Sequence, residues 1–202
     1  MRTLAFLSLL TLVSSVVASD RPRSFRHDVL PVLSKAGCNS GGCHGALAGK
    51  GGFRLSLNAY DPATDYYNIT RENRGRRIEY ADPARSLFVI KPTAAVRHKG
   101  GKILHEDSDD YKLLIEWIQQ GAPAPSTDDT ELNRIELSPA ISQLKKGDTQ
   151  SLTVHAFFSD GTKRDVTRWA RFTSTDATVV EVDEATGFAK VCLLYTSAAA
   201  DE

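Results

Sequence analysis

The spacing of hydrophobic residues along the chain predicts helices in its first part and strands in its last part. Over residues 24–35, apolar side chains recur at positions 25, 29, 32 and 33, and Ser24 stands where a capping side chain is expected. The pattern predicts a helix that Pro31 kinks or shortens, because proline has no backbone N–H to donate.

A second helical pattern, over residues 109–120, is the clearest in the chain. Its apolar stripe consists of Tyr111, Leu114, Ile115 and Ile118, with Trp117 adding width. Gly121 follows at the position of a left-handed cap residue. Between the two helices, residues 53–108 have turn signals at 61–62, 82–83 and 100–101 and little periodicity, which predicts short helices in long loops.

The hydrophobic period changes to two beyond residues 122–129, which stop the second helix. Leu152, Val154, Ala156 and Phe158 alternate along a predicted strand, residues 159–161 predict a hairpin turn into residues 163–167, and residues 178–182 predict another strand. The expected fold class is therefore multidomain α plus β. A small all-α domain over residues 24–125 is followed by a linker at 126–131 and an all-β module over 132–191.

Composition narrows the function classes. The 202 residues carry 25 Lys and Arg against 25 Asp and Glu, so the net charge is zero and neither nucleic acid nor another polyanion is a favoured partner. The length is sufficient for one or two modest globular domains.

The two ends of the chain have patterns of their own. Residues 1–18 have the layout of a secretory signal, with Arg2, a short apolar run and small residues up to Ala18. The apolar run is too short to span a bilayer comfortably, so we expect export to the periplasm or cell surface with no stable membrane span; a retained anchor is the alternative. Residues 192–202 resemble the translated end of a sequencing adapter, which predicts a non-native tail; the alternative is a native final strand.

The region around the first two cysteines has the composition of a binding loop. Seven glycines lie between Gly37 and Gly52, and glycine permits unusual backbone conformations and close approach to a ligand. Covalent attachment of a c-type haem needs two thiols for the porphyrin vinyl groups and a histidine directly after the second thiol to bind the iron. Cys38, Cys43 and His44 meet this requirement, with four residues between the cysteines instead of the common two.

Two other interpretations of these cysteines remain open. A disulfide between Cys38 and Cys43 suits an oxidising compartment. A zinc or copper site built from the cysteines and histidines is the second alternative. Neither explains why His44 must follow Cys43 directly.

The second axial ligand of the iron is expected to be a histidine. Met1 is the only methionine and is removed with the signal, so the common methionine ligand is excluded. His98, on a glycine-flanked loop shortly before the last helix, is favoured, with His105 in reserve. We expect His27 to be solvated and His155 to lie on a strand surface. An iron with an open position, as in a haem peroxidase, is the remaining alternative.

Basic residues provide candidates for further contacts. The run over residues 71–77 contains four arginines and is expected either to be a solvated loop or to contact haem propionates or an acidic redox partner. Arg97, Lys99 and Lys102 are equally suited to the propionates.

The residues of the first domain match a known pattern. The run from Phe25 to Gly45, residues 52–57, 60–62 and 75–77, His98 with Gly100 and Gly101, and residues 117–122 resemble the cytochrome c-like domain that begins large secreted proteins of planctomycetes and their relatives. The resemblance covers about residues 24–125. It implies a small cytochrome fold, and it implies His98 as distal ligand because the family's histidine before paired glycines aligns there.

The second domain also resembles a known module. Residues 135–139, 146–147, 150–154, 158–161, 165–167 and 179–180 are similar to bacterial Ig-like modules of group 2. This implies a β-sandwich whose last strand or strands are missing, which leaves an open sheet edge. We expect the full-length protein to continue into further domains.

These expectations combine into one leading hypothesis. The chain is expected to be an exported c-type cytochrome module, an electron carrier rather than an enzyme, that exchanges electrons with an unknown redox partner or downstream domain. The alternative is a cell-surface adhesion or spacer protein in which Cys38 and Cys43 form a disulfide and no haem is bound.

Overall fold

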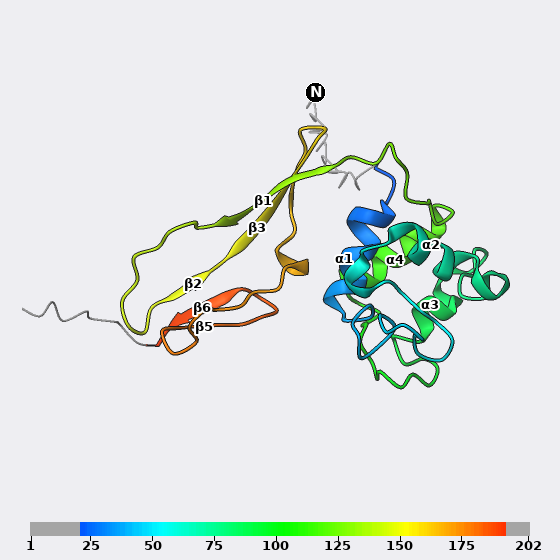
Figure 1. The fold of residues 1–202 in the computed structure, drawn as a ribbon, viewed down its shortest axis with the longest axis horizontal. Helices are drawn as coiled ribbons and strands as arrows, with labels where there is room; N and C mark the ends of the chain where they lie inside the picture. The colour runs from blue at the N-terminus through cyan, green and yellow to red at the C-terminus, as the bar shows by residue number, and fades with distance from the viewer. Residues whose placement is uncertain (1–20, 193–202) are drawn as a thin grey trace, which may run out of the picture.

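The computed structural model describes residues 21–192, and Figure 1 shows helices in the earlier part of this range and antiparallel strands in the later part. The mixture of helices and antiparallel sheets predicted from the sequence is confirmed. The predicted signal over residues 1–18 and residues 193–202 of the predicted tail lie outside the described residues. None of the helices described between residues 21 and 192 is long and apolar enough to cross a membrane.

The first predicted helix is present and has two parts, η1 (Phe25–Val29) and α1 (Leu30–Lys35). Ser24 caps it, since its hydroxyl accepts a hydrogen bond from the backbone N–H of His27 at 3.2 Å. The turn η1 is wide: Val29 N–H donates to the Ser24 carbonyl at 3.2 Å, five residues back. Pro31 follows this wide turn, so the expected local disturbance takes the form of a π-helical turn.

The middle of the chain contains short helices, as expected. They are η2 (Leu57–Ala59), α2 (Pro62–Thr70), η3 (Glu72–Gly75), η4 (Pro83–Arg85) and α3 (Leu87–Ile90). The predicted turns at 61–62 and 82–83 are instead the starts of helices. Proline suits the first position of a helix, because the backbone N–H that it lacks would have no partner within the helix. Asp61 caps α2 by accepting from Thr64 N–H at 3.0 Å, whereas the side chain of Asp82, directly before η4, makes no capping hydrogen bond.

The last helix, α4 (Asp109–Gln119), agrees closely with its predicted bounds. Gly121 has φ +85°, the left-handed conformation expected of the residue after a helix. The buried face differs from the predicted stripe, because it consists of Leu113, Leu114, Trp117 and Ile118, while Tyr111 and Ile115 are only partly buried.

Trp117 is the centre of the helical core. Its side chain is fully buried, and its ring lies 5.5 Å from Phe25 of η1 and 6.2 Å from Phe88 of α3, measured between ring centroids. Arg23 and Glu116 form an ion pair at 2.5 Å beside this contact. These contacts pack the first helix against the last.

The later part of the chain forms two three-stranded antiparallel sheets. One has the order β1 (Leu132–Ser138), β3 (Thr153–Phe158), β4 (Lys163–Asp165), and the other β2 (Thr149–Ser151), β6 (Phe188–Val191), β5 (Val180–Val182). Along β3 the buried residues are Val154, Ala156 and Phe158, which confirms the predicted period of two. The predicted hairpin turn before β4 is present, with Gly161 at φ +81°.

The strand β1 forms an open edge of its sheet. It pairs only with β3 among the described strands, and each of its residues is exposed, including Ile135 with 59% of its surface accessible. A strand that is paired on one side only leaves a row of unpaired backbone N–H and C=O groups at the sheet edge.

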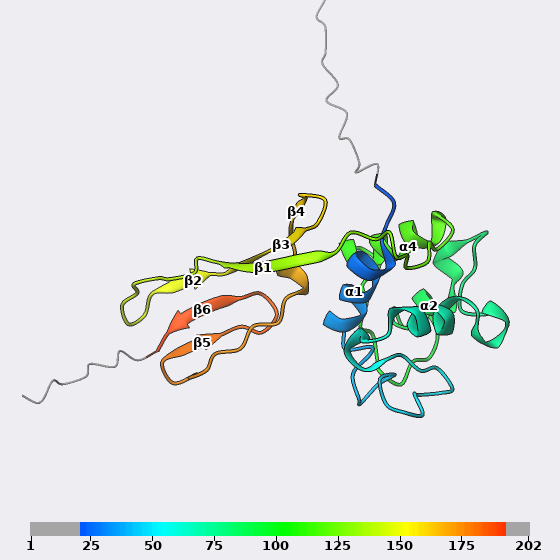
Figure 2. The same ribbon diagram turned by 45° about the horizontal axis from the view of Figure 1, so that its top comes forward.

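The helical and strand parts contact one another along the first helix, as the views in Figures 1 and 2 suggest. The ammonium of Lys35 donates to the carbonyls of Ala170 at 2.5 Å and Ala185 at 3.0 Å. Arg164 of β4 forms an ion pair with the fully buried Asp28. The expectation that His27 is solvated was wrong, because its Nε2 lies 2.6 Å from the Thr130 carbonyl and its ring packs edge-on against Phe158.

Candidate functional site

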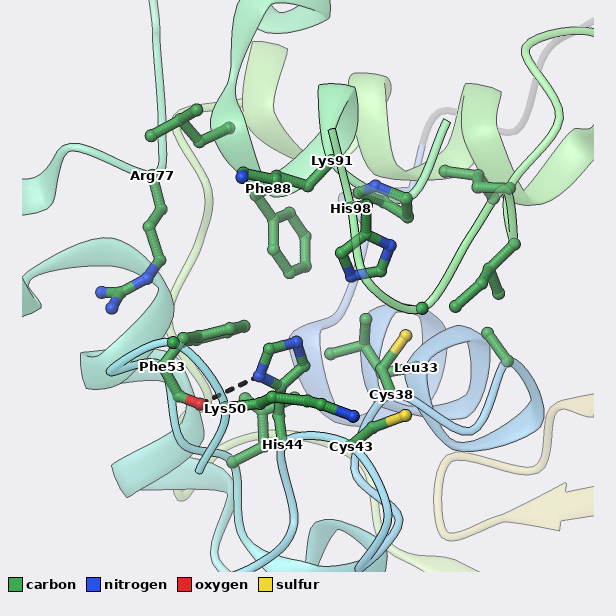
Figure 3. Close-up of a pocket in the computed structure, with 18 of the residues that line it drawn as sticks. Leu33, Cys38, Cys43, His44, Lys50, Phe53, Arg77, Phe88, Lys91 and His98 are labelled. Atoms are coloured by element: carbon green, nitrogen blue, oxygen red, sulfur yellow. Dashed lines mark hydrogen bonds between the residues drawn. The ribbon is translucent and has the colours of Figure 1, made fainter. Parts of the chain in front are cut away.

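A pocket of about 740 Å³ opens between the end of α1, the glycine-rich segment after it, α3 and the segment before α4 (Figure 3). This volume is in the range of pockets that hold a cofactor-sized molecule. Its walls are largely apolar and include Val32, Leu33, Ala36, Phe53, Leu55, Leu87, Phe88, Pro92, Ile103, Leu104 and Leu114.

The segment from Cys38 to His44 forms one wall as a closed loop. The backbone N–H of His44 donates to the carbonyl of Cys38 at 2.9 Å, which joins the two ends of the loop. The side chain of Asn39, within the loop, is buried, and its amide nitrogen donates to the Ser34 hydroxyl at 2.8 Å. The four residues between the cysteines are thus accommodated by a compact turn.

Both thiols of this loop line the pocket. Figure 3 shows the sulfur atoms of Cys38 and Cys43 pointing to the same side, and neither is joined in a disulfide. Burial, with a smaller contribution from the neighbouring Cys43, raises the pKa of the Cys38 thiol to about 11. The Cys38 thiol is therefore protonated at neutral pH.

His44 is held with one ring nitrogen free. Its Nδ1 lies 2.9 Å from the backbone carbonyl of Phe53, and because a carbonyl only accepts hydrogen bonds, Nδ1 carries the proton. Burial lowers the pKa of His44, an effect that this hydrogen bond partly opposes. Burial therefore favours the neutral ring with the proton on Nδ1, the form in which the Nε2 of imidazole binds a metal.

His98 has the same arrangement on the opposite side of the pocket. Its Nδ1 lies 3.0 Å from the carbonyl of Gly101, so here too Nδ1 is the donor and Nε2 is free. Gly100 packs against this ring closely enough that a β-carbon at position 100 would lie 2.8 Å from its Cε1 atom. The paired glycines noted in the sequence therefore shape the turn that holds His98.

The two imidazoles face one another across the pocket (Figure 3). Their centroids are 6.5 Å apart and their planes differ by 13°. Two imidazoles that bind one metal from opposite sides place their ring centres about 6 Å apart, since each metal–nitrogen bond is about 2 Å. The spacing of His44 and His98 fits a single metal atom between them.

The other candidate histidines lie elsewhere. His105 is exposed and does not line the pocket, and His27 lies at the contact with the strands. His155 is on β3, where it is partly buried and stands opposite Glu136 and Asp165. Among the candidates weighed, the structure brings His98 and no other histidine to His44.

The rim of the pocket is basic. Its charged lining residues are Lys50, Arg76, Arg77, Lys91, Arg97 and Lys99, and no acidic residue among residues 21–192 lines it. Of the basic residues predicted from the sequence, Arg76 and Arg77 of the run over 71–77, Arg97 and Lys99 line the pocket. Lys50 and Lys91 were not predicted, because no local pattern marks them. Lys102, also named, is not among the lining residues.

No three His, Cys, Asp or Glu side chains within residues 21–192 gather closely enough to hold a bare metal ion. The zinc or copper alternative therefore has no assembled ligand set in this part of the chain. In comparisons with known proteins, no family model matches the chain, and a search of curated proteins found no significant match.

Proposed function

We propose that the chain is an exported c-type cytochrome module that binds one haem covalently in this pocket and transfers electrons. The observation that carries the proposal is the facing pair His44 and His98, each with Nε2 free and 6.5 Å between ring centroids, on a pocket that also receives two thiols. His44 and His98 would both hold the iron, which would leave it no open position for a substrate, and such a site would suit electron transfer better than catalysis.

The residues present fit a haem in four respects. Cys38 and Cys43 supply two sulfur atoms from one loop, and His44 follows directly. The apolar walls match the porphyrin ring, and the basic rim matches the two propionate groups on its edge. A structural disulfide between Cys38 and Cys43 would require neither the facing imidazoles nor this cavity.

Each group has a defined task in this proposal. The two thiols would each add S–H across a vinyl double bond of the porphyrin, so that no atom is lost and no oxidant is needed. The carbonyls of Phe53 and Gly101 fix the orientation of the two imidazoles. Leu33, Phe88 and Leu104 keep water from the ring, which reduces the solvent reorganisation that accompanies a change of charge. When bound, the haem supplies an iron that accepts and releases one electron.

The finer fold assignment belongs to the same proposal. Packing of the first and last helices beside the pocket supports a cytochrome c-like domain, and two antiparallel sheets after residue 131 support an Ig-like sandwich. We propose that the second module acts as a structural partner of the first, and that the electron acceptor or donor is another protein or a downstream domain.

The test is to produce the protein in a host with c-type maturation machinery and to record a pyridine haemochrome spectrum after denaturation. We expect a haem that stays with the chain, and its loss in the variant Cys38→Ala/Cys43→Ala. Cys192→Ala is the matched control, because Cys192 does not line the pocket, and it should keep the haem. A colourless wild-type product with a Cys38–Cys43 disulfide would favour the adhesion or spacer alternative.

A further inference from the structure

Arg77 is a charged residue inside the helical domain. Only 5% of its surface is exposed, and it lies beside the pocket. Burial lowers the pKa of its guanidinium, a cost that the ion pair with Glu72 at 3.0 Å offsets in part. A buried arginine is retained only where its hydrogen bonds are satisfied, so its partners indicate what it holds in place.

The donors of Arg77 are directed to the backbone. Its Nη1 donates to the carbonyl of Asn68 at 2.8 Å, and its Nη2 donates to the carbonyl of Gly52 at 3.3 Å. Gly52 has φ +71°, a left-handed backbone conformation that favours glycine. Arg77 therefore fixes the backbone directly before Phe53.

Arg77 also contacts the side chain of Phe53. Its guanidinium carbon lies 4.5 Å from the centroid of the Phe53 ring, a cation–π distance. The same ring lies 4.7 Å from the imidazole of His44, and the Phe53 carbonyl accepts the Nδ1 proton of His44. A continuous line of contacts thus runs from Arg77 through Phe53 to His44.

We infer that Arg77 is a positioning residue for His44, which acts through the ring and carbonyl of Phe53 to fix the imidazole for the iron. The inference rests on the proposed function and adds a residue that the haem itself need not touch. Arg76 provides the contrast: it also lines the pocket, but it is exposed and has no hydrogen bond or ion pair within the described residues. Arg76 is therefore free for a propionate, whereas the donors of Arg77 are engaged with the protein.

The first test uses the haem-free chain, which keeps it independent of haem loading. In wild type, imidazole ¹⁵N spectra should show His44 protonated at Nδ1. Arg77→Lys keeps the charge but loses the planar stacking and the paired donors, so the Nε2-protonated form should appear alongside. Arg76→Lys, the matched control, should leave the His44 signals unchanged. An unchanged His44 spectrum in folded Arg77→Lys would overturn the inference.

The second test uses the haem-loaded protein and its midpoint potential. A weaker Nδ1–H···O bond makes His44 a poorer electron donor to the oxidised iron, so Arg77→Lys should raise the potential while the haem stays attached. Phe53→Leu removes the ring and keeps the backbone carbonyl, so adding Arg77→Lys to it should shift the potential less than Arg77→Lys alone. Additive shifts, or no shift, would contradict the inference.

Failure of the cytochrome proposal and failure of the Arg77 proposal give different results. A wild-type chain without haem refutes the cytochrome, while attached haem with an unchanged potential and unchanged His44 spectrum refutes only the role of Arg77. If Arg77→Lys does not fold, the double variant Glu72→Gln/Arg77→Gln removes both charges of the ion pair together and is measured in the same two assays.

Discussion

The α-carbon of Gly45 lies against the backbone carbonyl of Asn39, so closely that a β-carbon at position 45 would be 2.1 Å from the carbonyl oxygen. The neighbouring atoms are backbone and cannot rotate away. This contact closes the loop that carries Cys38, Cys43 and His44 immediately behind the histidine.

Substitution of Gly45 by alanine should therefore destabilise the haem-free protein by about 1–3 kcal/mol, the usual cost of forcing extra volume into a packed site. Gly42→Ala is the control, because a β-carbon at position 42 meets nothing within 4 Å. Urea unfolding of both variants measures the difference. Equal stability of the two would show that the loop is not closed in this way.

Removal of the His98 imidazole should change the spin state of the haem iron. In the haem-loaded protein, His98→Ala should abolish the low-spin spectrum entirely, since one axial position loses its ligand. His105→Ala, a change at an exposed histidine away from the pocket, should leave the spectrum as in wild type. A low-spin spectrum that persists in His98→Ala would exclude His98 as ligand.

Acid should lower the stability of the strand module, because several of its aspartates accept hydrogen bonds from a threonine two or three residues later. The hydroxyl and backbone N–H of Thr167 lower the pKa of Asp165, and Asp160, Asp176 and Asp183 have pKa values lowered in the same way by a nearby threonine. A carboxylate whose folded pKa is depressed stabilises the fold above its unfolded pKa of about 3.9, and this contribution is lost as pH falls through the lower folded pKa.

The stability of wild type relative to Asp165→Asn should therefore be constant from neutral pH to about pH 4 and decrease below it. Urea midpoints across this range give the comparison. Asp128→Asn, at an exposed carboxylate that accepts no hydrogen bond in the described part of the chain, should show no such decrease. A wild-type advantage that grows in acid would have the wrong sign for this explanation.

The contact between the two modules should depend on Lys35. Burial, and then the charge of Arg171, lower the pKa of Lys35, whose ammonium donates to carbonyls of residues 170 and 185. Lys35→Met keeps the stem but removes these bonds, and it should weaken the contact by about 1 kcal/mol. Faster proteolytic cleavage within residues 123–131 would report it, with exposed Lys99→Met as control. Identical cleavage rates would indicate that the bonds contribute nothing.

Much of the local structure follows from the sequence. Ser24 and Gly121 mark helix ends by their chemistry, and the alternation along β3 marks which residues are buried. These features depend on neighbours along the chain, so a pattern of spacing is enough to predict them. The same holds for Cys38, Cys43 and His44, which lie close together in sequence and on one loop that lines the pocket.

Features made by distant segments could not be predicted in the same way. The buried face of α4 includes Leu113 because α4 packs against other helices, and His27 is enclosed because β3 brings Phe158 to it. Lys50 and Lys91 reach the pocket from separate segments, and Arg77 contacts Phe53 across 24 positions of the chain. Only the folded chain shows these contacts.

The intact mass of the protein, produced with c-type maturation machinery, tests the central claim most directly. Because each thiol adds across a vinyl group without loss of atoms, the wild-type chain should exceed its polypeptide mass by that of one whole haem under denaturing conditions. Cys38→Ala/Cys43→Ala should have its polypeptide mass alone. A wild-type chain that weighs only what its amino acids weigh would contradict the account.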